Sequence, residues 1–261
     1  MNDRERFYHE TVDSLIKDKS ASVLVCGGGE RDKNTLENLK FSNVTISNLD
    51  ERMEGEKYAP YAWSYENAEQ LSFADMTFDY VIIHEAIHHS SLPHKVLSEM
   101  YRVAKIAVLA IESRDSLVMR FLERFELTQT YEHAAVYYSD CLYGGVNNTE
   151  IPNYIYRWTE REIEKTIMSY SPYAKDTFIY RYGLGFPSTP QLGKTKNLIL
   201  KISQPFFWLF TKLFPKQQNL FAFYIEKTSP RKLFPWLIFD TDKQKITFNK
   251  PWANEKYNKL F

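Results

Sequence analysis

Cysteine and long apolar runs are both scarce in this sequence of 261 residues. The 2 cysteines, Cys26 and Cys141, exclude a disulfide framework and a four-cysteine zinc site. No stretch reaches the roughly 18 apolar residues that a membrane span requires. The opening residues, MNDRERFYHE, lack the apolar core of a signal peptide. These absences predict a cytoplasmic protein.

A net charge is also lacking, since 33 Lys and Arg balance 33 Asp and Glu. The charges are unevenly distributed along the chain, however. From Thr189 onward there are 13 basic and 4 acidic residues, whereas residues 1–188 contain 20 basic and 29 acidic ones. An acidic body and a neutral total favour no nucleic acid partner.

The residues that are present, 44% hydrophobic and 16% aromatic, are typical of a globular chain of one or two domains. Strand-like and helical patterns alternate over the first 115 residues. Strands are predicted at 21–26, 44–47, 78–83 and 106–111, and helices at 4–18, 32–40 and 93–103. Alternation of this kind predicts a parallel sheet flanked by helices.

The remainder of the chain departs from this alternation. A helix is predicted at 116–126, a capping box at Thr159 and Glu162, strands at 177–182 and 220–225, and a hairpin within 235–248. The aromatic segment 194–214 has helical spacing, and Ser203 and Pro205 are expected to divide it into two helices. We expect these helices to cover the sheet, and the alternative is an element at a membrane surface or lipid-linked acceptor.

Three of the 9 glycines lie together in VLVCGGGERD, residues 23–32, where a strand runs into a helix. Glycines let backbone N–H groups come close to a ligand at a helix N-terminus. The same pattern also occurs in a simple turn, and Arg31 stands where a dinucleotide-binding fingerprint has its third glycine. The glycine cluster alone therefore leaves both interpretations open.

Further motifs follow in a fixed order. They are SNLD at 47–50, NAEQLSF at 67–73, FDYVII at 78–83, IHH at 87–89 and YRV at 101–103 before the apolar run IAVLAI. Residues 20–115 thereby resemble the S-adenosylmethionine-dependent methyltransferases with a Rossmann-like fold, of the methyltransferase-11 type. The resemblance implies a mostly parallel sheet with an antiparallel final strand, helices on both faces, and insertions on the substrate side.

The resemblance also implies a cofactor site for S-adenosylmethionine. Gly27, Gly28 and Gly29 would form its turn, with Gly27 and Gly29 against the methionine part, so a Val side chain at Gly29 is expected to block binding. Either Asn48 or Asp50 would bind the ribose, Asn67 and Ala68 would face the adenine, and His84 would lie near the sulfonium. Val25, Arg31 and Asn48 depart from the family pattern, which usually has acidic residues at the first and third positions and glycine at the second.

His84-Glu85-Ala86-Ile87-His88 also matches the HExxH pattern of zinc hydrolases, with His94 as a third ligand. Such ligands must share one face of a helix, whereas the apolar run FDYVII places His84 and Glu85 at a strand end. Ser91 stands where the extended pattern has glycine, and Pro93 interrupts the segment. We therefore expect no metal site, and methyl transfer itself requires none.

Polar residues gather at the predicted strand ends, where open α/β sheets bind their ligands. His84, His88 and Glu85 are the candidate catalytic residues, since a histidine near neutral pKa can accept a proton from the methyl acceptor. His89, Glu112 and Arg114 are the candidate substrate contacts. An Arg–Asp pair that caps the next helix is an equal alternative for Arg114.

We predict one domain over residues 1–261, with a cofactor-binding core at 20–115, a lid or acceptor-recognition insert at 131–172, and a basic aromatic segment with the last strand at 189–261. The predicted reaction moves a methyl group to an oxygen or nitrogen of a small-molecule, sugar or lipid-linked acceptor. A weak contact of 194–214 with a membrane surface is a further expectation. The alternative function is a binding or scaffold protein that kept the fold but lost methyl transfer.

Overall fold

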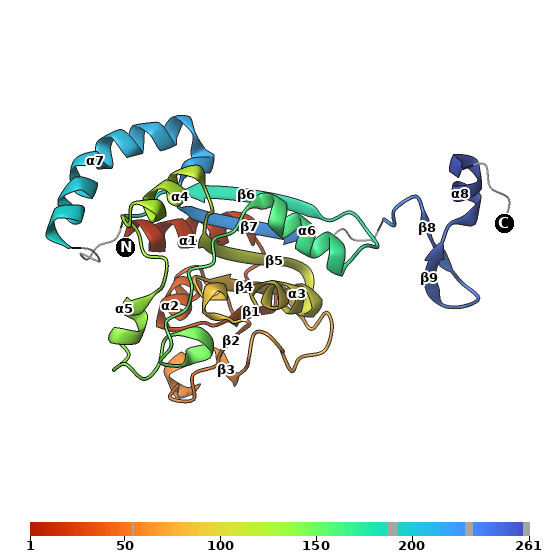
Figure 1. Cartoon of the computed structure of the whole chain (residues 1–261). Helices are drawn as coiled ribbons and strands as arrows, with labels where there is room; N and C mark the ends of the chain where they lie inside the picture. The colour runs from red at the N-terminus through yellow and green to blue at the C-terminus, as the bar shows by residue number, and fades with distance from the viewer. Residues whose placement is uncertain (54, 187–192, 228–231, 258–261) are drawn as a thin grey trace.

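A seven-stranded sheet forms the centre of the computed structural model, which describes residues 1–53, 55–186, 193–227 and 232–257 (Figure 1). The strands lie in the order β3-β2-β1-β4-β5-β7-β6. Their bounds are β1 Val23–Cys26, β2 Val44–Asn48, β3 Ala62–Tyr65, β4 Phe78–His84, β5 Ala104–Ser113, β6 Thr177–Gly183 and β7 Leu220–Glu226. β7 runs antiparallel to both of its neighbours, and the pairs among β1 to β5 are parallel. The predicted Rossmann-like methyltransferase sheet is confirmed.

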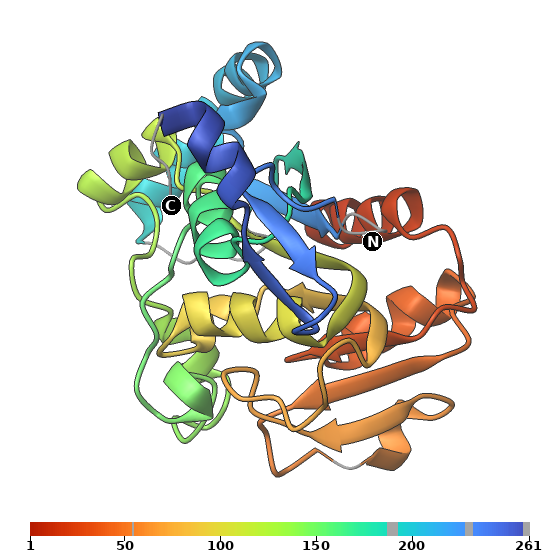
Figure 2. The same ribbon diagram turned by 90° about the vertical axis from the view of Figure 1, so that its right-hand side faces the viewer.

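Helices cover both faces of this sheet because its strands alternate between two apolar cores. Val23 and Val25 of β1 belong to one core, and Leu24 and Cys26 belong to the other. The first core is covered by α1 (Asp3–Leu15) and α2 (Glu30–Asn38), and the second by α3 (Pro93–Val103) and α6 (Glu160–Tyr170). The layers are seen from a second side in Figure 2.

The strand order reverses between β1 and β4, since β1 is followed by β2 on one side and by β4 on the other. The crossovers from these two strands leave the sheet in opposite directions and open a crevice at the strands' carboxyl ends. The glycine turn follows β1 at this point, and Glu85 follows β4. The fold therefore brings the predicted site residues to one edge of the sheet.

Two further short helices lie between β5 and α6. They are α4 (Leu117–Arg124) and α5 (His133–Tyr137), with 3-10 turns η1 (Gly55–Tyr58), η2 (Ile87–His89), η3 (Val146–Asn148) and η4 (Pro215–Gln217) elsewhere in the chain. β3, with the sequence AWSY, was not predicted, because its half-exposed residues form no apolar run. It extends the sheet by pairing with β2.

α7 (Lys194–Leu213) corrects the expectation for segment 194–214 in two respects. It is one helix with Pro205 inside it, and not two helices divided at Ser203 and Pro205. Figure 1 shows it bent, as expected where proline removes a helical hydrogen bond. It also does not cover the sheet, because Thr211 is its one buried residue.

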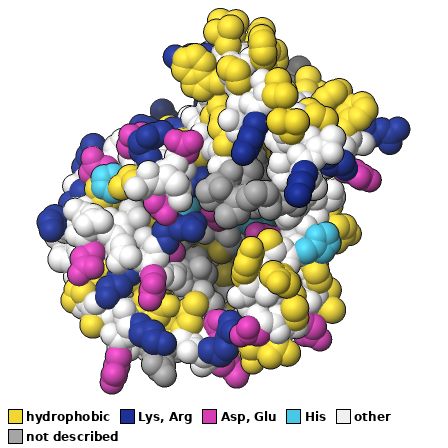
Figure 3. Space-filling view, turned by 90° about the vertical axis from the view of Figure 1, so that its left-hand side faces the viewer, with side chains coloured by type: hydrophobic (Ala, Val, Ile, Leu, Met, Phe, Trp, Pro, Cys, Tyr) yellow, Lys and Arg dark blue, Asp and Glu magenta, His cyan; other side chains and the backbone are white. Residues whose placement is uncertain are grey.

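The apolar side of α7 faces away from the protein. Seven residues at helical spacing face the body, and five of them are polar: Lys196, Asn197, Leu200, Ser203, Gln204, Phe207 and Thr211. The exposed residues include Leu198, Ile199, Ile202, Phe206, Trp208, Leu209, Phe210 and Leu213. Figure 3 shows hydrophobic side chains gathered at the top of the face on which α7 lies. A helix in a globular core has the opposite orientation.

The C-terminal part forms a small separate layer. The hairpin of β8 (Leu237–Asp240) and β9 (Lys245–Phe248) is confirmed, and α8 (Lys250–Tyr257) follows it. Trp236 contacts both Phe234 and Trp252 through their rings. The predicted segment 189–261 falls partly outside the described residues, at 189–192, 228–231 and 258–261. Among the described residues, no helix combines the length and apolar character that crossing a membrane requires.

Candidate functional site

The turn after β1 is shaped by its glycines in three different ways. Gly27 has a φ of +61°, which favours glycine, and a Cβ there would lie 2.7 Å from Cβ of Ala86. Gly28 donates its N–H to the carbonyl of Ser47 at 2.9 Å, which ties the turn to β2. Gly29 is the N-cap of α2, and its N–H bonds to the Asp32 carboxylate. A Cβ at Gly29 would meet no atom within 4 Å, and Gly29 does not line the cavity described next.

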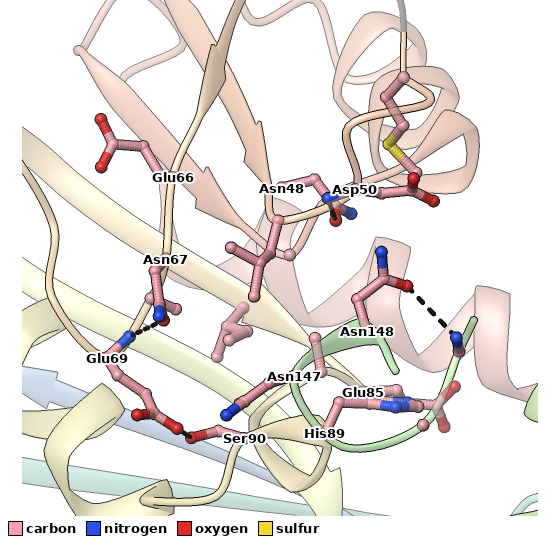
Figure 4. A pocket seen from close by; sticks show the side chains of 18 of the residues that line it. Asn48, Asp50, Glu66, Asn67, Glu69, Glu85, His89, Ser90, Asn147 and Asn148 are labelled. Carbon is pink, nitrogen blue, oxygen red and sulfur yellow. Dashed lines mark hydrogen bonds between the residues drawn. The ribbon is translucent and has the colours of Figure 1, made fainter. Parts of the chain in front are cut away.

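A first cavity of about 390 Å³ opens at the carboxyl ends of β1, β2 and β4 (Figure 4). This volume falls in the range of small-molecule sites, about 300–1,000 Å³. Seven residues with predicted roles line it: Gly27, Asn48, Asp50, Asn67, Ala68, Glu85 and His89. The structure thus brings together residues that are up to 62 positions apart in the chain.

Asn48 and Asp50, at the end of β2, have different partners. Asn48 donates its side-chain N–H to the Gly28 carbonyl at 2.9 Å, so its amide secures the glycine turn. The Asp50 carboxylate accepts two hydrogen bonds from the Arg52 guanidinium, at 2.9 and 2.6 Å. These bonds lower the pKa of Asp50, which therefore carries a negative charge at the wall of the cavity at neutral pH.

The segment from Ser139 to Asn148 contributes five residues to the lining of the first cavity. The Tyr143 ring lies 3.8 Å from the Arg52 guanidinium carbon in a cation–π contact. Asn147 accepts a hydrogen bond from the Ser91 N–H and donates one to the Ser91 hydroxyl. This segment belongs to the predicted insert 131–172, whose role as a lid or acceptor-recognition loop stays a prediction.

Residues 67–73 are held in place by the hydrogen bonds of two charged side chains, Glu69 and Arg102. Glu69 accepts hydrogen bonds from the hydroxyls of Ser90 and Ser91. Arg102 donates to the carbonyls of Leu71 and Phe73 and pairs with Glu99 at 2.7 Å. Asn67 and Ala68 therefore lie on a fixed segment at the cavity wall, where Figure 4 shows Asn67 beside Glu69.

Glu85 lines both the first cavity and a second one of about 360 Å³. It forms an ion pair with Arg4 of α1 and lies 3.5 Å from Arg31. Burial opposes its ionisation, but the charge and hydrogen bond of Arg4, together with the nearby histidines, outweigh burial and lower the pKa of Glu85. Two arginines from the first third of the chain thus meet a strand-end carboxylate.

The second cavity has a basic wall. Its charged lining residues are Arg4, Arg31, Glu85, His88, Glu132 and Arg157. Arg157 is buried, with 6% of its side chain exposed, and it pairs with Glu123. Sequence reasoning missed Arg4, Glu132 and Arg157, because each comes from outside the strand-end motifs and no local pattern marks it. Arg31 was noted only as a departure from the glycine pattern.

His88 and Glu112 form a buried pair beneath both cavities. His88 Nδ1 lies 2.6 Å from Glu112 Oε2, and the other oxygen of Glu112 accepts the backbone N–H groups of Ala86 and Ile87. His88 Nε2 lies 3.2 Å from the Glu132 carboxylate. Burial lowers the pKa of His88, but the charges and hydrogen bonds of Glu112 and Glu132 together outweigh burial and raise the pKa to about 10. Without a bound cation, His88 therefore holds its proton at neutral pH, which does not suit a general base.

His84, predicted to lie near the sulfonium, lines neither of the two cavities. Its ring stacks on Tyr8 at 4.1 Å, and its Nδ1 lies 3.7 Å from Asp32. His84 ends β4, whereas His88 belongs to η2, so the two histidines of the HExxH pattern do not share a helix. The pattern therefore lacks the geometry of a zinc hydrolase.

Glu112 and Arg114, predicted as substrate contacts, are likewise inside the protein. Glu112 is 1% exposed and bonds to η2, as described above. Arg114 pairs with Glu160 at 2.6 Å and donates to the Lys216 carbonyl. Neither residue lines the two cavities. Arg114 pairs with α6 and not, as the alternative had it, with Asp115, which bonds instead to Arg120.

Residues 24–110 match the family model of a methyltransferase domain. This chain has the fold and the domain of an S-adenosylmethionine-dependent methyltransferase. The matched residues begin in β1 and end in β5, so the methyltransferase domain contains the glycine turn, Asp50, Asn67 and Glu85. Among curated proteins, no sequence matches the chain.

Solved structures resemble the chain beyond this methyltransferase domain. A Thermotoga maritima protein described as a SAM-dependent methyltransferase and possible histamine N-methyltransferase has a TM-score of 0.52 at 13% identity, covering 87% of this chain and 90% of its own. A suspected methyltransferase from Bacillus halodurans C-125 has a TM-score of 0.50 at 16% identity, covering 85% and 99%. Identities this low establish a shared fold alone.

Proposed function

We propose that this methyltransferase domain binds S-adenosylmethionine in the first cavity and transfers its methyl group to an acceptor in the second. The observation that carries the proposal is the position of Glu85, which lines both cavities at the end of β4. Two ligands that meet at this side chain would approach each other closely enough for direct displacement. The cofactor, when bound, supplies a methyl group on a positively charged sulfur.

The residues of the first cavity fit the parts of this cofactor. Asp50 is ionised and offers carboxylate oxygens to ribose hydroxyls, and Gly27 leaves room for close approach of the methionine part. Asn67 and Ala68 provide a side-chain amide and a small apolar surface for the adenine. Glu85 places a negative charge near the sulfonium, and Arg4 keeps that carboxylate ionised.

The acceptor is proposed to be a small molecule or glycan that reacts through oxygen or nitrogen and carries an anionic group. Arg4, Arg31 and Arg157 line the second cavity, and an acceptor carboxylate or phosphate would pair with such guanidinium groups. The chain's main contribution is alignment, because His88 holds its proton between two carboxylates. His84 takes no part in this proposal, since it lines neither cavity.

The exposed side of α7 is proposed to make a weak contact with a membrane surface, where a lipid-linked acceptor would be found. Its apolar residues face away from the body, and Lys194, Lys201 and Lys212 are exposed among them. A helix with apolar and basic surface of this kind fits the interface of an anionic membrane.

Calorimetric titration with S-adenosylmethionine tests the first cavity directly. We expect Asp50→Asn to weaken binding about 10- to 100-fold, because a hydrogen bond to a charged group contributes about 1.5–3 kcal/mol. Glu51→Gln, a change at the exposed neighbouring residue, serves as the matched control and should bind like the wild type. No binding to the wild-type chain at millimolar cofactor would instead favour a scaffold that has lost methyl transfer.

Transfer of a tritiated methyl group to fractions of a cell extract identifies the acceptor. We expect labelled product in a fraction of small anionic molecules, glycans or lipids. Glu85→Gln should reduce labelling by about tenfold or more, since it removes the charge that faces both cavities. Labelling that is unchanged in Glu85→Gln would remove Glu85 from the proposed reaction centre.

A further inference from the structure

Two histidines and a glutamate converge at the floor between the two cavities. His88 and His89 belong to η2, and Glu132 comes from the residue before α5, 43 positions further along the chain. One potential ligand atom from each of the three lies within 4.8 Å of the others. His88 Nε2 and His89 Nε2 lie 3.2 and 3.4 Å from the same Glu132 oxygen. We call this group the histidine–glutamate cluster.

We propose that the histidine–glutamate cluster binds a divalent transition metal ion such as Zn²⁺ or Fe²⁺. Tetrahedral zinc with bonds of about 2.0–2.1 Å keeps its ligand atoms about 3.3 Å apart. The two distances to the Glu132 oxygen, 3.2 and 3.4 Å, already match this separation. Two of the three ligand separations therefore already suit a metal ion, and the two histidine nitrogens lie within 4.8 Å of each other.

Residues around the histidine–glutamate cluster form hydrogen bonds to its two histidines, as is usual at metal sites. Histidine ligands usually bond through their second ring nitrogen to a carboxylate or a backbone carbonyl. His88 Nδ1 has such a partner in Glu112, whose other oxygen is fixed by two backbone N–H groups. His89 has a hydrogen bond to the backbone of Gly145. Both rings thus present Nε2 to the same point.

The ligand types narrow the class of metal. Two imidazoles and one carboxylate suit zinc, iron, nickel or copper, whereas magnesium and calcium prefer oxygen ligands throughout. Three protein ligands leave at least one coordination position for an exogenous group, as in catalytic zinc sites. His89 lines the first cavity, and His88 and Glu132 line the second, so an open position would face ligand space.

A proton is the competing occupant of the cluster. Without a metal, the protonated ring of His88 lies between the two carboxylates, with Nδ1 toward Glu112 and Nε2 toward Glu132. Metal binding displaces this proton, because a ligating histidine must be neutral at the coordinating nitrogen. The protonated cluster and the metal-bound cluster differ in metal content, so measurement of bound metal distinguishes them.

Titration of the untagged full-length chain with Co²⁺, without cofactor or acceptor, tests the proposal. We expect visible absorption bands of low-coordinate cobalt that saturate at one ion per chain and disappear when Zn²⁺ is added. Glu132→Gln and His89→Ala should each weaken binding by at least tenfold. His133→Ala, at the exposed histidine beside Glu132, is the matched control and should bind like the wild type.

Glu112→Gln tests the hydrogen bond that holds the His88 ring. The amide oxygen of glutamine can still accept the backbone N–H groups of Ala86 and Ile87, but His88 loses its carboxylate partner. Loss of a carboxylate partner of this kind weakens metal binding about 10- to 100-fold. If Glu132→Gln does not fold, the half-buried His89 supplies the test in its place. The absence of cobalt bands in the wild type, or equal binding by folded His89→Ala and His133→Ala, would overturn the proposal. Because the titration contains no cofactor, its failure would leave the proposed methyl transfer standing.

Discussion

Gly27 and Gly29 are two positions apart, but the fold itself requires glycine only at the first. Gly27 combines a left-handed backbone with a Cβ position 2.7 Å from Ala86. Gly29 has an extended backbone and open space at its Cβ position. The expectation that a side chain at Gly29 would enter the cofactor's space stays a prediction, although Gly29 does not line the first cavity. The sequence GGG does not reveal which of its glycines has the left-handed backbone. That position is set by a contact with Ala86, which follows β4.

We predict that Gly27→Ala lowers the free energy of unfolding by about 2 kcal/mol or more. A left-handed non-glycine residue costs about 1–2 kcal/mol, and the contact with Ala86 adds to this cost. Gly29→Ser should change stability by less than about 0.5 kcal/mol, since serine is a favoured N-cap. Urea unfolding measures both variants. Equal losses would show that the turn has a different conformation in solution.

Local sequence patterns predicted the buried strands of the sheet but not the orientation of every helix and side chain. FDYVII and IAVLAI predicted β4 and β5, because strands buried on both faces consist of continuous apolar runs. The orientation of α7 could not be predicted, since its helical spacing is the same whether its apolar side faces the sheet or the solvent. The orientation of His84 could not be predicted for a related reason. Alternation along β4 turns its ring toward Tyr8, and the motif did not indicate that α1 covers this face.

The contact between α3 and residues 67–73 is predicted to depend on pH. The hydrogen bond from Arg102 lowers the pKa of Glu99, so the ionised carboxylate stabilises the folded state above its unfolded pKa. This contribution is lost as pH falls through the lower folded pKa. Glu99→Gln should therefore cost about 1–2 kcal/mol at pH 7, and the difference from the wild type should shrink below about pH 4.

Urea unfolding of both proteins at pH 7 and pH 3 measures this change. Glu10→Gln, at an exposed residue of α1, is the control and should match the wild type at both values. A difference for Glu99→Gln that stays constant with pH would mean that shape, and not charge, holds the segment in place.

In the whole molecule, part of the basic charge of the C-terminal region lies on the same surface as exposed apolar side chains. The basic excess after Thr189 is found partly on α7, which has four lysines and no acidic residue. Exposed apolar side chains of α4, Leu117, Phe121 and Phe125, add to the apolar side of α7. A groove of about 370 Å³ between Leu117, Phe121, Phe210 and Phe214 joins the two helices. The sequence indicated both components, and the fold places them on one surface.

We predict that this surface binds vesicles that contain anionic lipid, in a manner that salt weakens. Apolar residues such as Phe206 and Leu209 are 76% and 56% exposed and would enter the headgroup boundary, while the lysines attract the lipid charge. Replacing both with glutamate should reduce the partition coefficient at least tenfold, since burial of one such side chain contributes about 1.5–3 kcal/mol. Phe239→Glu, at an exposed residue of β8, is the control. Sedimentation at low and high salt measures the binding. Equal sedimentation of the α7 variant and the control would contradict the prediction, because the exposed side of α7 would then have no role in it.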